Sequence, residues 1–288
     1  MVGHTVTRLG ARAFPWTWLC VVAFVAALQL ASASLSAAAI ADPEQAWASL
    51  ANEVFKGRSR IDGSGLVGIE MPARAEDAAI VPVTMRVTLP AGDTRSLKML
   101  TLVIDENPAP VAATFEFGDH AGVSVISTRV RVNSYTNVHL VAELSDSKVY
   151  VVKTYVKASG GCAAPAAKNL DEATASLGQM RFRMFGKPID GDTSVPREAQ
   201  VMIRHPNNSG LQRDQVSLLY IPAHFVDELR MWQGDSLLFS VGGGISISED
   251  PNFRFNYIPN GASTFKAEAR DTQGKVFRRE WPVSASEI

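Results

Sequence analysis

The stretch Val81-Pro82-Val83-Thr84-Met85-Arg86-Val87-Thr88-Leu89 decides the fold class, because its odd-numbered positions are all apolar and its even-numbered positions are not. Successive side chains of a β-strand point to opposite faces of the sheet, so a period of two predicts a strand with one buried face. Pro82 falls on the other, exposed face, where proline is tolerated. The stretch therefore predicts a half-buried strand.

Similar short runs recur on both sides of this stretch, separated by turn residues and without helical patterns between them. In the first half they span residues 97–104, 128–132, 139–144 and 149–156. In the second half they span residues 181–184, 200–204, 228–232, 236–241, 253–257, 265–269 and 276–283. Several short strands at close spacing are typical of antiparallel sandwiches. Because 288 residues suit two domains, we predict an all-β protein made of two antiparallel β-sandwich domains.

One short helix is expected near the N-terminus. Asp42-Pro43-Glu44 offers an N-cap, a proline at the first helical position and an acidic first turn. Apolar residues then follow at helical spacing, and Gly57 ends the pattern. These residues are Trp47, Leu50, Ala51 and Val54. The pattern predicts an amphipathic helix that lies against the first domain.

Residues 1–41 have the layout of a secretory signal peptide. A basic start with Arg8 and Arg12 precedes an apolar run, and small residues then lead to Ala39-Ile40-Ala41, an A-x-A cleavage site. The apolar run is short for a membrane span, although an uncleaved anchor is the alternative. The sequence therefore predicts export, which in a bacterium means the periplasm.

Cleavage would leave Cys162 as the only cysteine, because Cys20 lies within the apolar run. A lone cysteine in an exported protein indicates a reactive thiol or intermolecular pairing. The chain has 28 Lys and Arg against 29 Asp and Glu, so no basic surplus favours nucleic acid or an anionic membrane as a partner.

The surroundings of Cys162 favour an exposed thiol. Gly160 and Gly161 precede it, and Ala163-Ala164-Pro165 follows it. These residues have little apolar surface to bury, and two glycines form a flexible hinge. Lys157 and Lys168 are close in sequence and would lower the pKa of the thiol if they lay beside it, but the sequence does not place them near the sulfur. The competing interpretation is a small buried side chain, since free cysteine is often buried.

No other constellation indicates catalysis or a cofactor. The four histidines that follow the signal peptide are scattered, without a metal-binding spacing, and no second cysteine joins them. They are His120, His139, His205 and His224. The acidic residues show no tight pair. We therefore expect no metal, no cofactor and no enzymatic activity.

Beyond these patterns, the chain resembles a family. Residues 105–108 (DENP), 113–117 (ATFEF) and 127–130 (STRV), followed by Gly160-Gly161-Cys162, resemble SoxY. Residues 203–206 (IRHP), 209–214 (SGLQRD), 221–225 (IPAHF) and 246–251 (SISEDP) resemble SoxZ. SoxY and SoxZ are the subunits of the periplasmic sulfur carrier of bacterial thiosulfate oxidation. The fused order resembles the single-chain SoxYZ-like carriers associated with quinoprotein dehydrogenases.

This resemblance implies a division of the chain and an immunoglobulin-like fold for each domain. Residues 1–41 are the signal peptide and residues 42–158 the SoxY-like domain with its N-terminal helix. Residues 159–180 are the arm and linker, and residues 181–288 the SoxZ-like domain. The two domains are expected to pack within one molecule.

The resemblance also implies a function: Cys162 carries a sulfur-linked intermediate while partner redox enzymes, Sox-type enzymes or a quinoprotein dehydrogenase with its cytochrome c, process it. Two features depart from the family pattern. Ala163-Ala164 stands where the family has trailing glycines, and the arm is tethered at both ends. Such an arm is expected to present its cargo at a surface rather than inside a deep channel.

Two other functions remain open. In the first, the chain is a non-covalent accessory module of a periplasmic dehydrogenase or cytochrome, and the thiol is dispensable. In the second, the two sandwiches form an adhesion-type pair, which leaves Cys162 unexplained.

Overall fold

The computed structural model describes residue 3 and residues 43–165, 170–186 and 195–283. Apart from residue 3, the predicted signal peptide lies outside these residues. Among the described residues, none of the helices combines the length and the apolar character that a membrane span requires.

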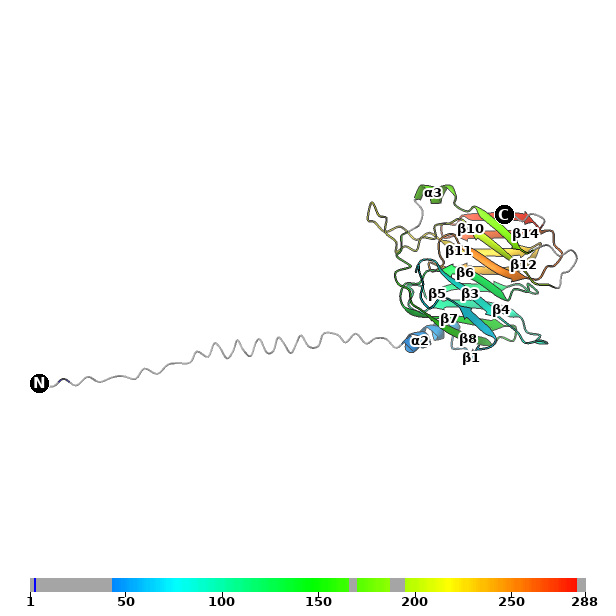
Figure 1. Ribbon diagram of the computed structural model, residues 1–288, viewed down its shortest axis with the longest axis horizontal. Helices are drawn as coiled ribbons and strands as arrows, with labels where there is room; N and C mark the ends of the chain where they lie inside the picture. The colour runs from blue at the N-terminus through cyan, green and yellow to red at the C-terminus, as the bar shows by residue number, and fades with distance from the viewer. Residues whose placement is uncertain (1–2, 4–42, 166–169, 187–194, 284–288) are drawn as a thin grey trace. The chain divides into compact units, whose positions relative to one another are not determined.

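The predicted N-terminal helix is confirmed as α2 (Pro43–Phe55). Its apolar face covers the outer side of the sheet near β7 and β8 (Figure 1), where Ala51 and Phe55 are buried against Val141 and Val149. The ring of Trp47 also stacks on the imidazole of His139, with centroids 3.6 Å apart. Burial of this face therefore fixes the helix on the first half of the chain.

The described part of the first half contains eight strands. They are β1 (Arg60–Asp62), β2 (Val67–Glu70), β3 (Val81–Val87), β4 (Leu97–Ile104), β5 (Val111–Phe117), β6 (Val125–Val130), β7 (Thr136–Leu144) and β8 (Val149–Val156). In β3 every odd-numbered residue is buried, as the alternating sequence predicts.

The second half begins after the short helix α3 (Leu170–Ala175) and contains seven strands among the described residues. They are β9 (Met180–Phe185), β10 (Arg197–Ile203), β11 (Val226–Gln233), β12 (Ser236–Gly243), β13 (Asn252–Tyr257), β14 (Thr264–Asp271) and β15 (Val276–Pro282). The all-β prediction with a short N-terminal helix is thus confirmed.

The two halves share their sheets. One sheet has the strand order β1-β8-β7-β4-β5-β12-β11-β14-β15, and the other has the order β2-β3-β6-β13-β10-β9. The two halves meet where β5 pairs with β12 and β6 pairs with β13, both antiparallel (Figure 1). The two predicted sandwiches are therefore joined edge to edge, and the joining strands have no free edge at this point.

A single apolar core fills the space between the two sheets of both halves. At the junction, Phe115 of β5 and Phe239 of β12 meet Phe253 of β13, at centroid distances of 6.0 and 6.4 Å. Phe239 also makes an edge-to-face contact with Phe255 at 4.9 Å. These aromatic contacts cross from one sheet to the other, so they hold both the layers and the halves together.

We expect Phe239→Ala to lower the free energy of unfolding by about 3–5 kcal/mol, the usual cost of removing a buried phenylalanine. Because the core is continuous, both halves should unfold in one transition in urea, before and after the substitution. Val276→Ala, at a half-exposed position on the edge strand β15, serves as the control. Two separate transitions, with only the second half affected, would contradict a shared core.

Candidate functional site

The chain around Cys162 forms a tight turn that is docked on the end of the first half. After β8, the amide of Gly160 donates to the carbonyl of Asn133 at 2.8 Å, and the amide of Gly161 donates to that of Val132 at 3.0 Å. The turn closes where the amide of Ala163 donates to the carbonyl of Gly160 at 3.1 Å. The turn therefore lies alongside Val132 and Asn133, which come directly after β6 and Arg131.

The two glycines serve different purposes in this turn. Gly160 has a φ of 79°, a left-handed conformation that favours glycine, and open space around its Cα. Gly161 lacks free space: a Cβ there would lie 2.0 Å from the carbonyl oxygen of Ala78 and 2.7 Å from that of Val132. In this conformation the predicted hinge is a packed element, and hinge motion at Gly160 and Gly161 stays a prediction.

The Cys162 side chain is fully buried, so the expectation of an exposed thiol is wrong for this conformation. The physical reason is that the small neighbours of Cys162, which have little apolar surface, allow the backbone to approach closely and make hydrogen bonds. Burial raises the pKa of the thiol, and the nearby charge of Arg131 offsets this only in part. A buried thiol with a raised pKa is protonated and unreactive at neutral pH.

The second half of the chain covers the turn and binds its backbone. The hydroxyl of Ser209 donates to the carbonyl of Cys162 at 2.5 Å, and the side-chain amide of Gln212 donates to the carbonyl of Ala164 at 2.9 Å. The amide of Ser209 in turn donates to the Gln212 side chain at 3.0 Å, which orients both residues. We call Ser209 and Gln212 the clasp. Both partners of the clasp are backbone carbonyls, so the clasp holds the turn through its backbone and not through the sulfur.

Arg131 is a buried charge between the two halves. Its guanidinium donates to the carbonyl of Gly161 at 3.3 Å and to the carbonyl of Asn207 at 3.4 Å, while its Nε has no hydrogen-bond partner among the described residues. Burial lowers the pKa of Arg131, although nearby acidic groups, Glu249 first, act to raise it. This side chain bridges the Cys162 turn and the segment that covers it.

Sequence reasoning did not find Arg131. The alternation of residues 128–132 placed it on the exposed face, but β6 ends at Val130 and the next residues leave the strand, so Val130, Arg131 and Val132 are all buried. Of the two lysines that are close to Cys162 in sequence, Lys157 is exposed and Lys168 lies outside the described residues.

Two of the four histidines come together beside the clasp. The rings of His205 and His224 are 4.5 Å apart, and the Oδ2 atom of Asp271 lies 2.9 Å from His224 Nε2 and 3.6 Å from His205 Nε2. Of the other two, His139 binds Asp105 under α2, and His120 lies in an exposed turn. His205, His224 and Asp271 are far apart in the sequence, so their spacing did not predict this cluster.

The three side chains form a potential metal-binding group, and their ligand atoms lie within 4.8 Å of one another. The hydrogen bonding favours a structural role. The amide of Asn207 donates to Nδ1 of His205 at 3.1 Å, so neutral His205 carries its proton on Nε2, the atom that a metal would need. Metal-binding histidines normally donate from the other nitrogen instead. We interpret the cluster as the support of the loop that carries the clasp.

Burial, followed by the neighbouring His224, lowers the pKa of His205 to about 4. For Asp271, burial acts to raise the pKa, but hydrogen bonds from His224 and from the amides of Lys275 and Gln273 lower it overall. His205 is therefore neutral at pH 7, and the Asp271 carboxylate is hydrogen-bonded to His224 while Nε2 of His205 lies 3.6 Å from it.

Two family models match this chain. The model described as sulfur oxidation protein SoxY matches residues 51–162, and its match ends on Cys162. The model described as sulphur oxidation protein SoxZ matches residues 190–282. The chain contains a SoxY domain followed by a SoxZ domain. The clasp therefore belongs to the SoxZ domain, and the turn it holds is the end of the SoxY domain.

Solved structures and curated proteins add little to this identification. The sulfur carrier protein SoxY from Chlorobium limicola f thiosulfatophilum is 23% identical over 38% of this chain and 89% of its own, with a TM-score of 0.31. Two variants of the superoxide reductase (neelaredoxin) from Ignicoccus hospitalis are each 12% identical. They cover 32% and 40% of this chain and 78% and 90% of their own, each with a TM-score of 0.29. No curated protein matches.

SoxY and SoxZ domains are non-catalytic sulfur carrier domains, which implies a carrier role in sulfur oxidation for this chain. With both domains in one chain, the pairing of the two is intramolecular, as β5–β12 and β6–β13 show. The predicted domain boundaries stay predictions.

We expect Gly161→Ala to release the Cys162 turn, because the new Cβ would overlap two backbone carbonyls that cannot move aside. Overpacking of this kind costs about 1–3 kcal/mol, so Cys162 should react with a disulfide reagent roughly 10–100 times faster than in the unaltered protein. Gly68→Ala, where the Cβ would make an ordinary contact at 3.8 Å, is the matched control. Equal labelling rates for both variants would contradict the docked turn.

We also expect the protein to lose stability in acid because His205 is buried. Between pH 6.5 and about 4 the unfolded chain protonates His205 while the folded chain does not, so stability present above pH 6.5 is lost as the pH falls. The loss should reach about 3 kcal/mol. His205→Asn keeps an acceptor for the Asn207 amide and cannot take a proton, so its stability should vary less between pH 7 and 4. An unchanged pH dependence in urea titrations would contradict this assignment.

Proposed function

We propose that the chain is a periplasmic carrier that holds a sulfur-linked intermediate covalently on Cys162 while partner redox enzymes process it. The observation that carries this proposal is the way the turn is held. Ser209 and Gln212 bind the backbone carbonyls of Cys162 and Ala164, and neither hydrogen bond involves the sulfur atom. A group attached to the sulfur can therefore be exchanged without loss of the residues that recognise the turn.

Loading requires that the turn opens. The docked thiol is protonated, because burial raises its pKa, and only the thiolate attacks or is oxidised readily. Once the turn is in solvent, the thiol returns to an ordinary pKa. A sulfur anion then forms an S–S bond with Cys162, the thiol proton goes to solvent, and two electrons leave to an acceptor. Docking would protect the thiol between these events.

The acceptor belongs to the partner. We propose that c-type cytochromes, reached directly or through a quinoprotein dehydrogenase, take the two electrons, one electron per haem. The association with a quinoprotein dehydrogenase rests on the resemblance of the fused domain order, and the periplasmic location rests on the layout of residues 1–41. The expectation of surface presentation rests on the tethered arm, because residues on both sides of Cys162 are anchored.

The second candidate function is the non-covalent accessory module, and the complete burial of Cys162 is the observation that favours it. In that case the two domains would bind a dehydrogenase or cytochrome, and the thiol would serve only to fill the turn.

The two candidates differ in what happens to Cys162 in its own cell. For the carrier, protein isolated from the periplasm should show, by intact-mass analysis, an added sulfur-containing group that a thiol reductant removes and that Cys162→Ser lacks. Thiosulfate-dependent reduction of cytochrome c by periplasmic extract should also fall to background in Cys162→Ser. Cys162→Ala is the structural control, since it keeps the turn without a hydroxyl.

Unmodified Cys162 together with full activity of the serine variant would overturn the carrier and support the accessory module.

A further inference from the structure

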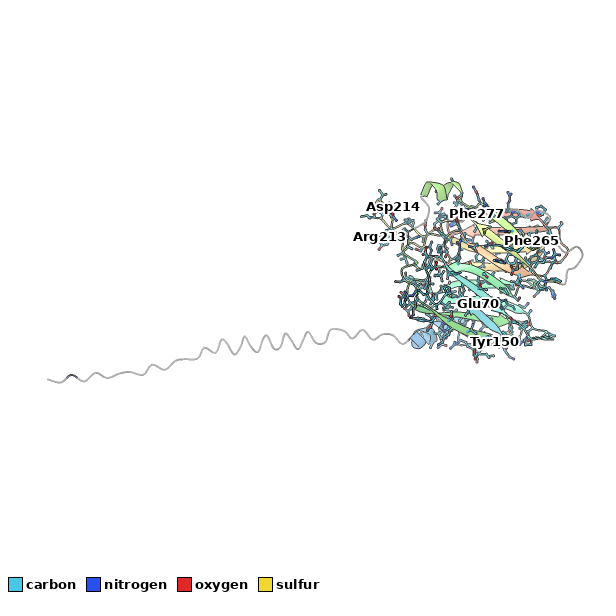
Figure 2. The ribbon with its side chains drawn as sticks, viewed as in Figure 1. Glu70, Tyr150, Arg213, Asp214, Phe265 and Phe277 are labelled. Carbon is cyan, nitrogen blue, oxygen red and sulfur yellow. The ribbon has the colours of Figure 1, made fainter. Side chains whose placement is uncertain are left out.

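The SoxZ domain carries a hairpin whose end exposes large apolar side chains. Figure 2 labels Arg213 and Asp214 on this hairpin, at the margin of the folded unit. Its end exposes Val216, Leu218, Leu219 and Tyr220, with exposed fractions of 93, 68, 70 and 60%. We call these four residues the apolar tip. Single exposed apolar residues are common on protein surfaces, but a contiguous group indicates an interaction site.

The hairpin is built by its own hydrogen bonds. One carboxylate oxygen of Asp214 accepts from the amides of Val216 and Ser217 and from the hydroxyl of Ser217. The backbones of Asp214 and Leu219 are also joined at 2.9 Å, and Arg213 lies over the ring of Tyr220 at 4.8 Å. The apolar tip therefore has a defined shape without support from the core.

Leu218 adopts a strained backbone conformation. Its φ is 60°, in the left-handed region where glycine or asparagine is favoured and a bulky residue costs free energy. A leucine at this position is not explained by folding, because its side chain is mostly exposed. Strain of this kind is found at sites that bind other molecules.

The base of the hairpin is the clasp on Cys162. Gln212, which binds the carbonyl of Ala164, directly precedes Arg213, and the amide of Ile221 donates to the carbonyl of Gln212 at 2.9 Å. Ser209 also accepts from the amide of Leu211 while it donates to Cys162. One continuous loop therefore joins the apolar tip to the residues that hold the thiol down.

We propose that the apolar tip docks into an apolar groove of the redox enzyme that processes the group on Cys162, and that docking draws the clasp away from the turn. This inference rests on the proposed function. The tip binds the enzyme, and the movement of the clasp that follows exposes the thiol to that enzyme. The thiol is thus released where its partner is, and stays buried elsewhere.

The size and charge of the tip favour a redox enzyme as its partner over a second copy of this chain or an anionic membrane. Four side chains bury much less than the roughly 800 Å² per partner of a stable dimer, and small interfaces are typical of transient redox encounters. The tip itself carries no basic residue, and Arg213 beside it is stacked on Tyr220, so nothing attracts an anionic membrane.

The test uses the full-length mature protein with a photo-crosslinking phenylalanine in place of Leu219, added to periplasmic extract of its own cells. We expect a crosslink to one protein that carries haem c or a quinone cofactor, identified by mass spectrometry. The same crosslinker at Val276, on the edge strand β15, should not yield it. The unaltered protein should compete for the crosslink about ten times better than the double variant Val216→Ser, Leu219→Ser.

A crosslink only to a second copy, only to lipid, or to no redox protein would overturn the docking proposal, as would equal competition by the double variant. The proposed function fails separately. If Cys162 is never modified while the crosslink to a redox protein persists, the tip docks a partner but the chain is not a covalent carrier.

Discussion

The hydrogen bonds between β5 and β12 are the constraint on which the rest of the structure depends. They run from Phe117 opposite Phe239 to Ala113 opposite Gly243, and they make one sheet out of strands from two domains. Because the second sheet is joined in the same way at β6 and β13, the SoxZ domain has a fixed position relative to the end of the SoxY domain. Arg131, the clasp and the Cys162 turn meet only because of this junction.

The buried thiol is compatible with carriage if the turn opens locally. The turn is held mainly by bonds from Gly160, Gly161, Cys162 and Ala164 to their neighbours, each worth about 0.5–1.5 kcal/mol net. Freeing the backbone returns about 1–2 kcal/mol of conformational entropy per residue. These opposing contributions are of similar size, so opening should cost only a few kcal/mol, well below global unfolding.

Local patterns in the sequence predicted the strands that alternate and the helix that precedes them. Residues 97–104 and 149–156 form β4 and β8 with the predicted bounds, and β3 covers the first seven residues of the predicted stretch 81–89. The sequence did not predict β5, because Ala112, Ala113 and Glu116, which are depleted in strands, interrupt its strand-favouring residues and leave no clear alternation. The strand that joins the domains is thus one that an alternating pattern does not reveal.

The site was harder to predict because its parts are distant in sequence. The thiol and its two glycines were found, but their small side chains indicated exposure, whereas the structure uses the missing Cβ of Gly161 for close packing. Ser209 and Gln212 lie in the SoxZ-like stretch 209–214, but nothing local connects them with Cys162, and Arg131 has no local feature that sets it apart. Neither does the pairing of His205 with His224 through Asp271. All of them depend on long-range contacts that the strand pairing creates.

Labelling of Cys162 by a disulfide reagent as a function of urea distinguishes local opening of the turn from global unfolding. If the turn opens locally, the labelling rate at low urea should be nearly independent of urea concentration, because little surface is exposed on opening. If Cys162 becomes reactive only when the whole unit unfolds, the logarithm of the rate should rise from zero urea with the full slope of global unfolding. That second result would contradict a thiol that is buried at rest and released for transfer.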